Sequence, residues 1–258
     1  MTSTINADKI MNSSGDQDSG LDLLVNDQVK IKTANTDRIT VTDSAASMGD
    51  NFKLKLGTGN DLNIYHDGSN SYIEETGTGD THVVSNTVRI RADQINLSNN
   101  ANNLDGLTMD SSGHIKMPKQ PAFLVTKNAN QNNIAENTNV TVTFETEIFD
   151  QNADFASNTF TAPVTGRYQF NATVRLQDLD VDAHYIYLYL VTSNRSYQCI
   201  VTLSSYDEDI EYLTLNVPVL ADMDASDTAY VTVHLDSSGD IQVDVEQYNT
   251  FFSGYLVA

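Results

Sequence analysis

Acidic side chains form three short clusters in the second half of the chain, and carboxylates are groups that could bind a cation. Asp178, Asp180 and Asp182 alternate with other residues, and the further clusters occupy 207–209 and 222–224. Hard cations such as Ca²⁺ bind several oxygen ligands, which loops commonly supply. The sequence therefore suggests a Ca²⁺ site at Asp178, Asp180 and Asp182, and a solvated acidic loop is the alternative interpretation.

Catalytic motifs are absent from the sequence. It contains no nucleophile elbow, no phosphate-binding glycine loop and no histidine pair spaced for zinc. A spike that degrades polysaccharide would need two carboxylates converging in a groove, and 35 acidic residues do not by themselves identify such a pair. We therefore expect that the protein is not an enzyme, and a polysaccharide-degrading spike is an alternative class.

Charge and cysteine content argue against a nucleic-acid-binding protein and against a disulfide-stabilised or cysteine-zinc protein. A formal net charge of -21 repels nucleic acid, so we expect no nucleic-acid partner. Cys199 is the only cysteine, so the chain forms neither an internal disulfide nor a zinc site of several cysteines. No N-terminal signal segment and no run of about 18 apolar residues is present, so we expect no cleaved signal and no membrane insertion.

Tyr185, Tyr187 and Tyr189 alternate along one strand-like run. Alternate residues of a strand share a face, so the three rings are expected together on one face. The remaining residues of the run are expected on the opposite, core-facing side: His184, Ile186, Leu188 and Leu190. Tyrosine combines apolar area with a polar tip, which favours an interface between subunits. A sugar-binding platform is the alternative.

Four further residues lie in or near expected loops of the same region. Asn194, Arg195, Tyr206 and Tyr248 are of types that contact a receptor, and loops commonly carry binding residues. We predict them as receptor contacts on the basis of this position.

The elements that would position these residues are strands. Thr, Ser, Asn, Asp and Val are abundant and no stretch has a convincing helical period, which predicts an all-β protein. From residue 118 onward, longer strands recur at regular spacing, which is typical of a sandwich or jelly roll. Pro118 and Pro121 stiffen the connection before it.

Residues 21–117 have a different pattern. Strands of a few residues, including 83–84 and 88–91, alternate with turns rich in Gly, Asn and Asp. They are too short and too polar for an independent sandwich, and each would leave unpaired edges. Winding three chains together would pair these edges, so we predict an intertwined trimeric β shaft over residues 21–117.

The first 20 residues are polar, with Ile5 and Ile10 as isolated apolar side chains. Such a segment orders on a partner or stays a flexible tail. We therefore regard residues 1–20 as a candidate attachment segment, with Ile5 and Ile10 as its anchors.

Two separated motifs suggest a family. Phe160, Gly166, Tyr168 and Phe170 have the spacing F-x5-G-x-Y-x-F, and residues 252–256 read Phe-Ser-Gly-Tyr-Leu. Both motifs, in this order, resemble the C1q/tumour-necrosis-factor-like family. The resemblance implies that residues 118–258 form a jelly-roll knob that assembles as a homotrimer, and that a cation near the trimer apex is a fair hypothesis.

The remaining chain resembles another group. Residues 56–73 and 106–123 are similar to segments that recur in fibre-like structural proteins of marine bacteriophages, and residues 3–10 resemble their beginning. The resemblance implies a fibre or spike on the outside of a virion, attached to other virion proteins through its N-terminus. The knob would then bind a host cell-surface receptor, such as a glycan. A decoration or joint protein without host binding is the alternative.

Overall fold

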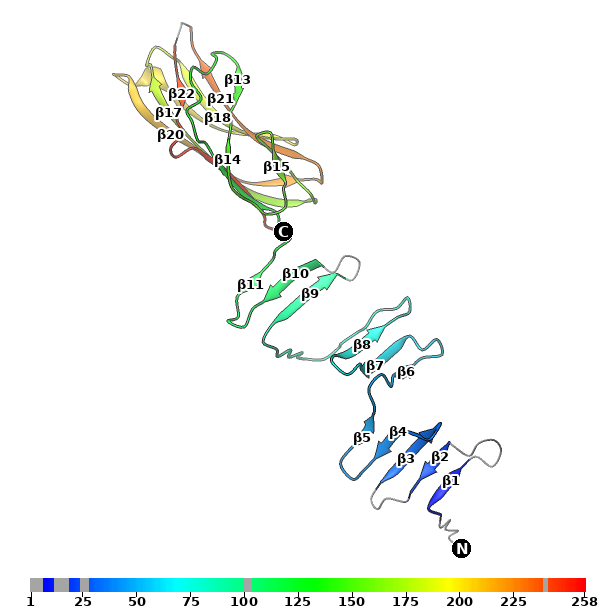
Figure 1. The fold of residues 1–258 in the computed structure, drawn as a ribbon. Helices are drawn as coiled ribbons and strands as arrows, with labels where there is room; N and C mark the ends of the chain where they lie inside the picture. The colour runs from blue at the N-terminus through cyan, green and yellow to red at the C-terminus, as the bar shows by residue number, and fades with distance from the viewer. Residues whose placement is uncertain (1–6, 12–18, 24–27, 100–103, 239–240) are drawn as a thin grey trace. The chain divides into compact units, whose positions relative to one another are not determined.

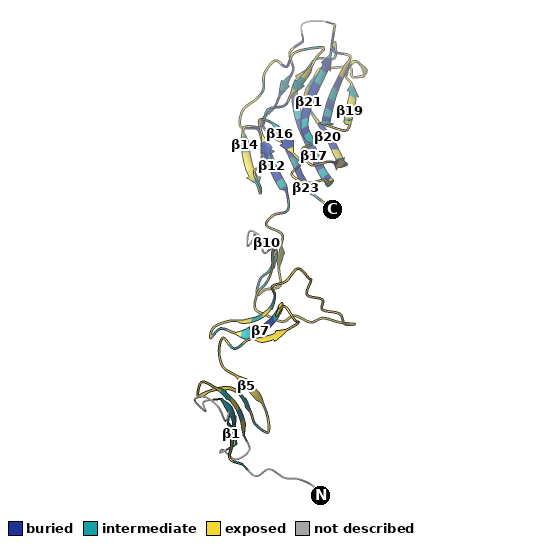
Figure 2. Ribbon diagram, turned by 90° about the vertical axis from the view of Figure 1, so that its right-hand side faces the viewer, coloured by how far each residue is buried: buried dark blue, intermediate teal, exposed yellow. Residues whose placement is uncertain are grey.

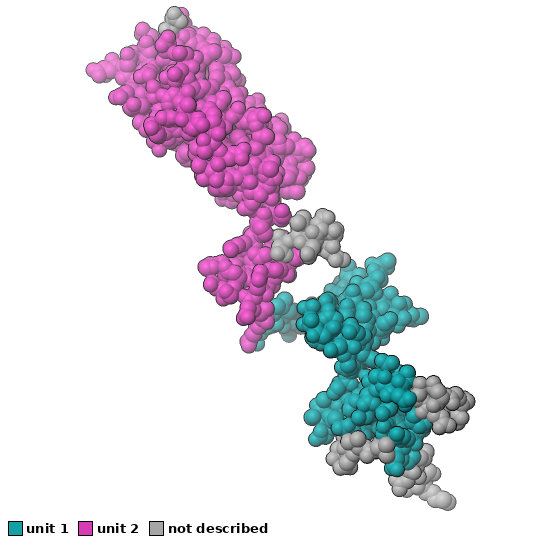
Figure 3. Space-filling model, viewed as in Figure 1, with its two compact units in different colours: residues 1–90 teal, residues 91–258 magenta. Residues whose placement is uncertain are grey.

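The computed structural model describes residues 7–11, 19–23, 28–99, 104–238 and 241–258. In these residues the protein is almost entirely β-structure, with a single 3-10 turn at Leu203–Ser205 and no other helix. The predicted all-β class is confirmed. The chain divides into two compact units, residues 1–90 and 91–258, which Figure 3 shows in different colours. None of the described residues forms a helix that is long and apolar enough to cross a membrane.

The first unit contains two small antiparallel sheets, and each is built from strands that follow one another in the sequence (Figure 1). The strands of the first sheet are β1 (Lys9–Met11), β2 (Gly20–Asp22), β3 (Val29–Thr33), β4 (Thr36–Val41) and β5 (Ala46–Met48). The second sheet consists of β6 (Leu54–Leu56), β7 (Leu62–His66) and β8 (Ser71–Glu75). Ala34 and Asn35, at φ 51° and 54°, form the two-residue turn between β3 and β4, and such positive φ values suit hairpin turns.

No strand forms between residues 76 and 94, all of which the structure describes. The predicted strands at 83–84 and 88–91 are therefore wrong for this chain. Val83 and Val84 are 71% and 89% exposed. A β-strand needs a hydrogen-bonded neighbour, and this chain brings none to the stretch.

The second unit begins with a three-stranded sheet and continues into a sandwich of two larger sheets (Figures 1 and 2). The small sheet consists of β9 (Ile95–Asn99), β10 (Leu104–Met109) and β11 (Ile115–Lys116). The described strands from β1 to β11 pair with sequence neighbours of their own chain. This differs from the predicted pairing between wound chains, since hairpins such as β3–β4 and β6–β7 pair within the chain. The trimeric arrangement stays a prediction.

The sandwich consists of two antiparallel sheets. The sheet that contains the C-terminal strand, here called the terminal sheet, has the order β14 (Thr146–Asp150), β12 (Ala122–Thr126), β23 (Phe251–Leu256), β17 (Gly166–Leu179) and β20 (Ile210–Met223), and β22 (Asp244–Val245) pairs with β17. The other, the tyrosine sheet, has the order β15 (Phe155–Ala156), β16 (Thr159–Thr161), β21 (Thr228–Asp236), β18 (Tyr185–Thr192) and β19 (Ser196–Thr202), and β13 (Asn139–Thr141) pairs with β21. These are sheets of the jelly-roll type.

The two ends of the sandwich differ in what they hold. The backbone N–H of Arg167 donates to the carbonyl of Ala258 over 2.7 Å, so the start of β17 and the C-terminus lie together at one end, here called the base. The chain also enters at the base, because Ala122 pairs with Tyr255. At the opposite end, here called the tip, Leu179 pairs with Ile210.

Aromatic rings fill the core near the base. The ring of Phe123 stacks on those of Phe155 and Phe160, with centroids 5.2 and 5.0 Å apart, and lies edge-on to Phe252 at 5.0 Å. Phe160 and Phe170 of the first family motif therefore contact Phe252 of the second through this cluster. Phe170 and Phe252 lie on the neighbouring strands β17 and β23 of the terminal sheet, and Phe160 lies on β16 of the tyrosine sheet, so the two motifs build one core.

Gly254 is required by this packing. A Cβ atom at position 254 would lie 2.5 Å from Cδ1 of Phe170 and 2.8 Å from Cε1 of Phe123, both of which are fully buried. No side chain fits there without moving a core ring. The glycine of the Phe-Ser-Gly-Tyr-Leu motif is thus explained by the close approach of β23 to the core.

Candidate functional site

The three predicted tyrosines lie together on the outer face of the tyrosine sheet. The rings of Tyr187 and Tyr189 are nearly parallel, with an interplanar angle of 9° and centroids 5.5 Å apart, and Tyr185 follows at 6.3 Å from Tyr187. The intervening residues are fully buried between the sheets, as predicted: Ile186, Leu188 and Leu190. We call the three rings the tyrosine ladder.

His184 does not share the core face, so that part of the prediction is wrong. Pairing of β18 with β21 begins at Tyr185 opposite Asp236, and His184 precedes the strand and is exposed. Its Nδ1 lies 3.3 Å from Oδ1 of Asp236. The alternation ends where the strand ends, so the His184 side chain lies beside the Asp236 carboxylate and is exposed to solvent.

The geometry of the ladder limits what it can bind. Because Tyr187 and Tyr189 stack, each ring covers a face of the other, and the edge of His234 packs against Tyr187 at 5.8 Å. Burial, and secondly the neighbouring Tyr187, raise the pKa of Tyr189. A sugar that stacks on an aromatic residue needs an exposed ring face. In the ladder, Tyr187 and Tyr189 each have one ring face covered by the other, which leaves less ring face for a sugar.

Sequence reasoning missed a second apolar surface, on the outer face of the terminal sheet. Phe149, Leu220 and Tyr255 are 48%, 52% and 49% exposed. Gln169 lies between Tyr255 and Leu220 in the register, so the two apolar side chains belong to one row across β23, β17 and β20. The alternation of Phe251, Ser253 and Tyr255 was a signal for this face, since residue 252 points to the core.

Asn194 and Arg195 lie in the turn between β18 and β19, at the base. The side-chain amide of Asn194 donates to the carbonyl of Asp222 and to Oδ2 of Asp227, over 2.9 and 3.0 Å. Nη2 of Arg195 lies 2.8 Å from Oδ2 of Asp222. Both side chains therefore bind the end of β20, and Asn194 also binds the turn that follows it, beside a hollow that Ala258 helps to line.

Tyr206 and Tyr248 lie elsewhere, so the structure does not bring the four predicted receptor residues together. Tyr206 follows the 3-10 turn after β19, near the tip, and is 46% exposed. Tyr248 lies in the loop before β23 and is 65% exposed. That loop is held to the distal half of β17, where the backbone N–H of Glu246 donates to the carbonyl of Arg175 over 2.8 Å.

The predicted acidic cluster also lies at the tip. Asp178 and Asp180 line a hollow of about 480 Å³, together with Asp209 and Glu211. Asp182 is not part of its lining, and its backbone N–H donates to Oδ1 of Asp180 over 2.8 Å. Among the residues that the structure describes, no three His, Cys, Asp or Glu side chains are arranged to hold a metal ion. The Ca²⁺ site stays a prediction.

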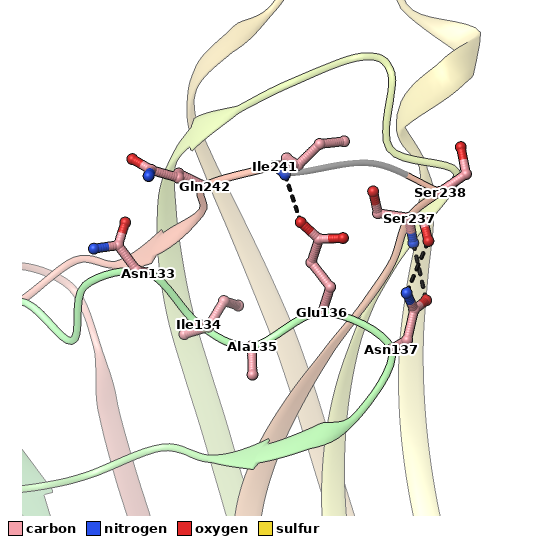
Figure 4. A pocket seen from close by; sticks show the side chains of 9 residues that line it. All are labelled: Asn133, Ile134, Ala135, Glu136, Asn137, Ser237, Ser238, Ile241 and Gln242. Carbon is pink, nitrogen blue, oxygen red and sulfur yellow. Dashed lines mark hydrogen bonds between the residues drawn. The ribbon is translucent and has the colours of Figure 1, made fainter.

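A larger hollow, of about 680 Å³, opens beside it at the tip (Figure 4). Its lining comes from residues 133–137 and from the segment after β21. Nδ2 of Asn137 donates to the carbonyl of Ser237 over 2.8 Å, and the carboxylate of Glu136 accepts the backbone N–H of Ile241. The lining is polar and its side chains bond mainly to backbone, which holds the tip loops to one another.

The predicted attachment anchors are placed only in part. Ile5 lies outside the described residues. Ile10 lies on β1, where it is 47% exposed.

Comparison with known proteins finds likeness in the sandwich. The family model described as the C1q domain matches residues 122–257. The globular domain of zebrafish complement 1qA protein is 18% identical over 54% of this chain and 98% of that chain, with a TM-score of 0.39. Murine APRIL at pH 8.0 is 11% identical over 54% of this chain and 100% of that chain, with a TM-score of 0.40. No curated protein sequence matches the chain.

Proposed function

The chain belongs to the C1q-domain family through residues 122–257, and from this premise we propose that it is a homotrimeric virion fibre or spike whose knob binds a host cell surface. Domains of this family generally form trimers, bind ligands and are not enzymes. The virion role is supported by the resemblance of residues 56–73 and 106–123 to bacteriophage structural proteins. The knob is the sandwich over residues 118–258, and the shaft covers residues 21–117.

One observation carries the proposal of host binding. The chain enters the sandwich at its base, where Ala122 pairs with Tyr255, so the tip is the end without a connection to the shaft. Exposed aromatic side chains lie toward that free end, at Tyr206 and Tyr248. Large amphipathic side chains at such positions are effective binding contacts. Asn194 and Arg195 lie at the base, so we expect them to contribute less than the two tyrosines.

A trimer multiplies these contacts. Three tips in one particle engage a surface together, and linked weak contacts give an overall affinity far above that of one tip. The proposal therefore needs only a modest affinity for each site, as is usual for glycans and other repeated surface groups.

Cell binding tests the proposal. The full chain, labelled with a fluorophore, is incubated with a panel of marine bacterial strains, and bound fluorescence is measured. We expect saturable binding to at least one strain and a loss of about tenfold or more in the double variant Tyr206→Ala, Tyr248→Ala. Val164→Ala, at a position on the base that is 46% exposed, is the matched control and should bind normally.

Two outcomes would contradict the proposal. Binding to no strain, with the chain trimeric by light scattering, would favour a decoration or joint protein without host contact. Equal binding by the double variant and the control would show that Tyr206 and Tyr248 do not contact the receptor and that its site lies elsewhere than at the tip.

A further inference from the structure

A row of apolar side chains crosses the whole first sheet of the chain. The register of β1 to β5 aligns five residues, one from each strand: Ile10, Leu21, Ile31, Ile39 and Met48. A second row on the same face contains Val29, Val41 and Ala46. Ile10, Ile31 and Met48 are 47%, 41% and 42% exposed, so in the single chain this face is open to water.

The opposite face of the same sheet is charged and internally paired. Nζ of Lys30 lies 2.9 Å from Oδ2 of Asp37. Nζ of Lys32 lies 3.0 Å from Oδ2 of Asp22 and 3.2 Å from Oδ1 of Asp37. Salt bridges of this kind are compatible with water. The sheet is therefore two-faced, with one side suited to solvent and the other suited to burial.

The second sheet repeats this arrangement with different residues. Leu54, Ile64 and Ile73 form one cross-strand row and are 41%, 40% and 71% exposed. On the other side of the strands, Nζ of Lys53 lies 3.4 Å from Oε2 of Glu74 and 4.1 Å from the centroid of the Tyr65 ring.

The third small sheet follows the same rule. Its register aligns Ile95, Met109 and Ile115 in one row, and Leu97 with Leu107 in the next. Ile115 and Leu97 are 62% and 58% exposed. Each of the three sheets thus has one apolar face that no element of its own sheet covers.

A single-layer sheet of this kind is an incomplete structure. A sheet that is apolar on one face normally buries that face against a second layer, and contiguous exposed apolar patches mark interaction surfaces. Burying such side chains is favourable roughly in proportion to the apolar area that is removed from water. The rows of the first sheet alone therefore provide a considerable driving force for covering that face.

We propose that the apolar face of each of these three sheets packs against the same face of two further copies of this chain, so that three sheets form a closed prism with a dry interior. The inference rests on the homotrimer of the proposed function and names the contact that builds its shaft. Chains then meet through sheet faces, while the hydrogen-bonded ladders stay within each chain.

Three observations favour copies of the chain over another occupant. The two-faced pattern recurs in three successive sheets of unrelated sequence, as expected if one assembly covers all of them. The sheets precede a domain whose family generally forms trimers, which would bring three copies of each sheet together. Finally, the named apolar rows contain no charged residue, so the net charge of -21 lies outside them; Glu75 places a carboxylate on one of these faces, where it pairs with Leu62 at the end of the second sheet.

Site-specific cross-linking of the full chain tests the proposal. Cys199 is first replaced by Ser. One variant then carries Ile39→Cys, on the apolar face, and its control carries Thr40→Cys, the next residue of β4 and therefore on the opposite face. Each is treated with a flexible bismaleimide, because a disulfide would require the Cα atoms to lie within about 7 Å. Denaturing gel electrophoresis separates the products, and light scattering gives the mass before treatment.

We expect Ile39→Cys to shift from a monomer band to a dimer band, which is the largest product that a bifunctional reagent can form with one cysteine per chain, while Thr40→Cys remains a monomer band. Equal cross-linking of both variants would overturn the proposed packing. If both stay monomeric on the gel while light scattering gives a trimer, the faces are covered by something else, and the trimer of the proposed function still stands. A monomeric mass would overturn both.

Discussion

Nζ of Lys127 lies 3.3 Å from Oε1 of Glu145, and the lysine side chain is completely withdrawn from solvent. The ammonium group also donates to the carbonyl and the hydroxyl of Thr143, over 2.8 and 2.9 Å. Burial lowers the pKa of Lys127. Burial acts to raise the pKa of Glu145, but hydrogen bonds from Thr143 and Asn128, together with Lys127, outweigh it and hold that pKa below its usual value. The pair joins β12 to the segment that leads into β14.

Replacing Lys127 with Met should destabilise the sandwich by about 1–3 kcal/mol. The carbonyl and the hydroxyl oxygen of Thr143 would each lose the hydrogen bond that the ammonium group donates, and Glu145 would lose its cation. Glu145 is 36% exposed and can recover water, so the loss stays below that of a fully buried pair. Urea unfolding measures the change. Lys119→Met, at an exposed position, is the control and should leave the free energy of unfolding unchanged. Equal stability of both variants would contradict this role of Lys127.

Asp154 should reduce stability at neutral pH. Its Oδ2 is buried without a hydrogen-bond partner among the described residues, and burial, followed by the charge of Asp150, raises its pKa. A raised folded-state pKa means that the stabilising contribution is present below the unfolded pKa and is lost as pH rises through the folded value. Asp154→Asn should therefore raise the melting temperature at pH 7, and the gain should disappear below about pH 4.

The control for Asp154→Asn must separate local burial from the general relief of negative charge. Asp207→Asn removes the same charge at an exposed loop position. Thermal unfolding of both variants at pH 7 and at acidic pH makes the comparison. A similar gain in both would assign the effect to net charge and not to the environment of Asp154.

Much of the sandwich could be predicted from the sequence, because the alternation of residues along a strand and the spacing within a motif depend only on neighbouring positions. The alternation of Tyr185, Tyr187 and Tyr189 with Ile186, Leu188 and Leu190 predicted the two faces of β18, and the motif at 160–170 indicated the jelly-roll sandwich. His184 could not be assigned in this way, since alternation does not reveal where the pairing partner Asp236 ends the strand.

Positions that depend on long-range pairing could not be predicted. Asn194 and Tyr206 are close in sequence and both lie in turns, but β19 carries the chain from the base toward the tip between them. The apolar rows of the first sheet depend on register, which the two-residue turn at Ala34 and Asn35 and the irregularity between Ile31 and Lys32 determine. Composition indicated short strands there but not which residues would align.

Gly254→Ala should be the most damaging single methyl addition in the knob. The new Cβ would lie 2.5 Å from a ring atom of Phe170, which is fully buried and cannot move aside. Overpacking of this kind costs about 1–3 kcal/mol or more. Gly166→Ala is the matched comparison, because its Cβ would lie 2.6 Å from Cδ1 of the half-buried Leu256 and 2.7 Å from the carbonyl oxygen of the exposed Ala258, both of which are less enclosed than the ring of Phe170. We expect a smaller loss for Gly166→Ala in thermal unfolding, and the reverse order would contradict this account.

Two outer faces of the knob are candidates for the contact between subunits of the trimer, and each candidate predicts a different effect of substitution. The tyrosine ladder was predicted from sequence, whereas the terminal sheet exposes Leu220 and Tyr255 more fully. Because the rings of Tyr187 and Tyr189 cover each other, we expect the terminal sheet to form the interface. Leu220→Asp would then bury a charge at the contact and weaken the trimer, whereas Tyr187→Asp should leave it intact.

Light scattering of the two full-length variants distinguishes the faces, with the wild-type mass expected at three times 28.4 kDa. Dilution increases the sensitivity, since a weakened trimer dissociates first at low concentration. Both side chains lie on outer faces, and circular dichroism verifies that each variant remains folded. A loss of mass in Tyr187→Asp alone would restore Tyr185, Tyr187 and Tyr189 as the interface and leave Leu220 and Tyr255 available for another partner.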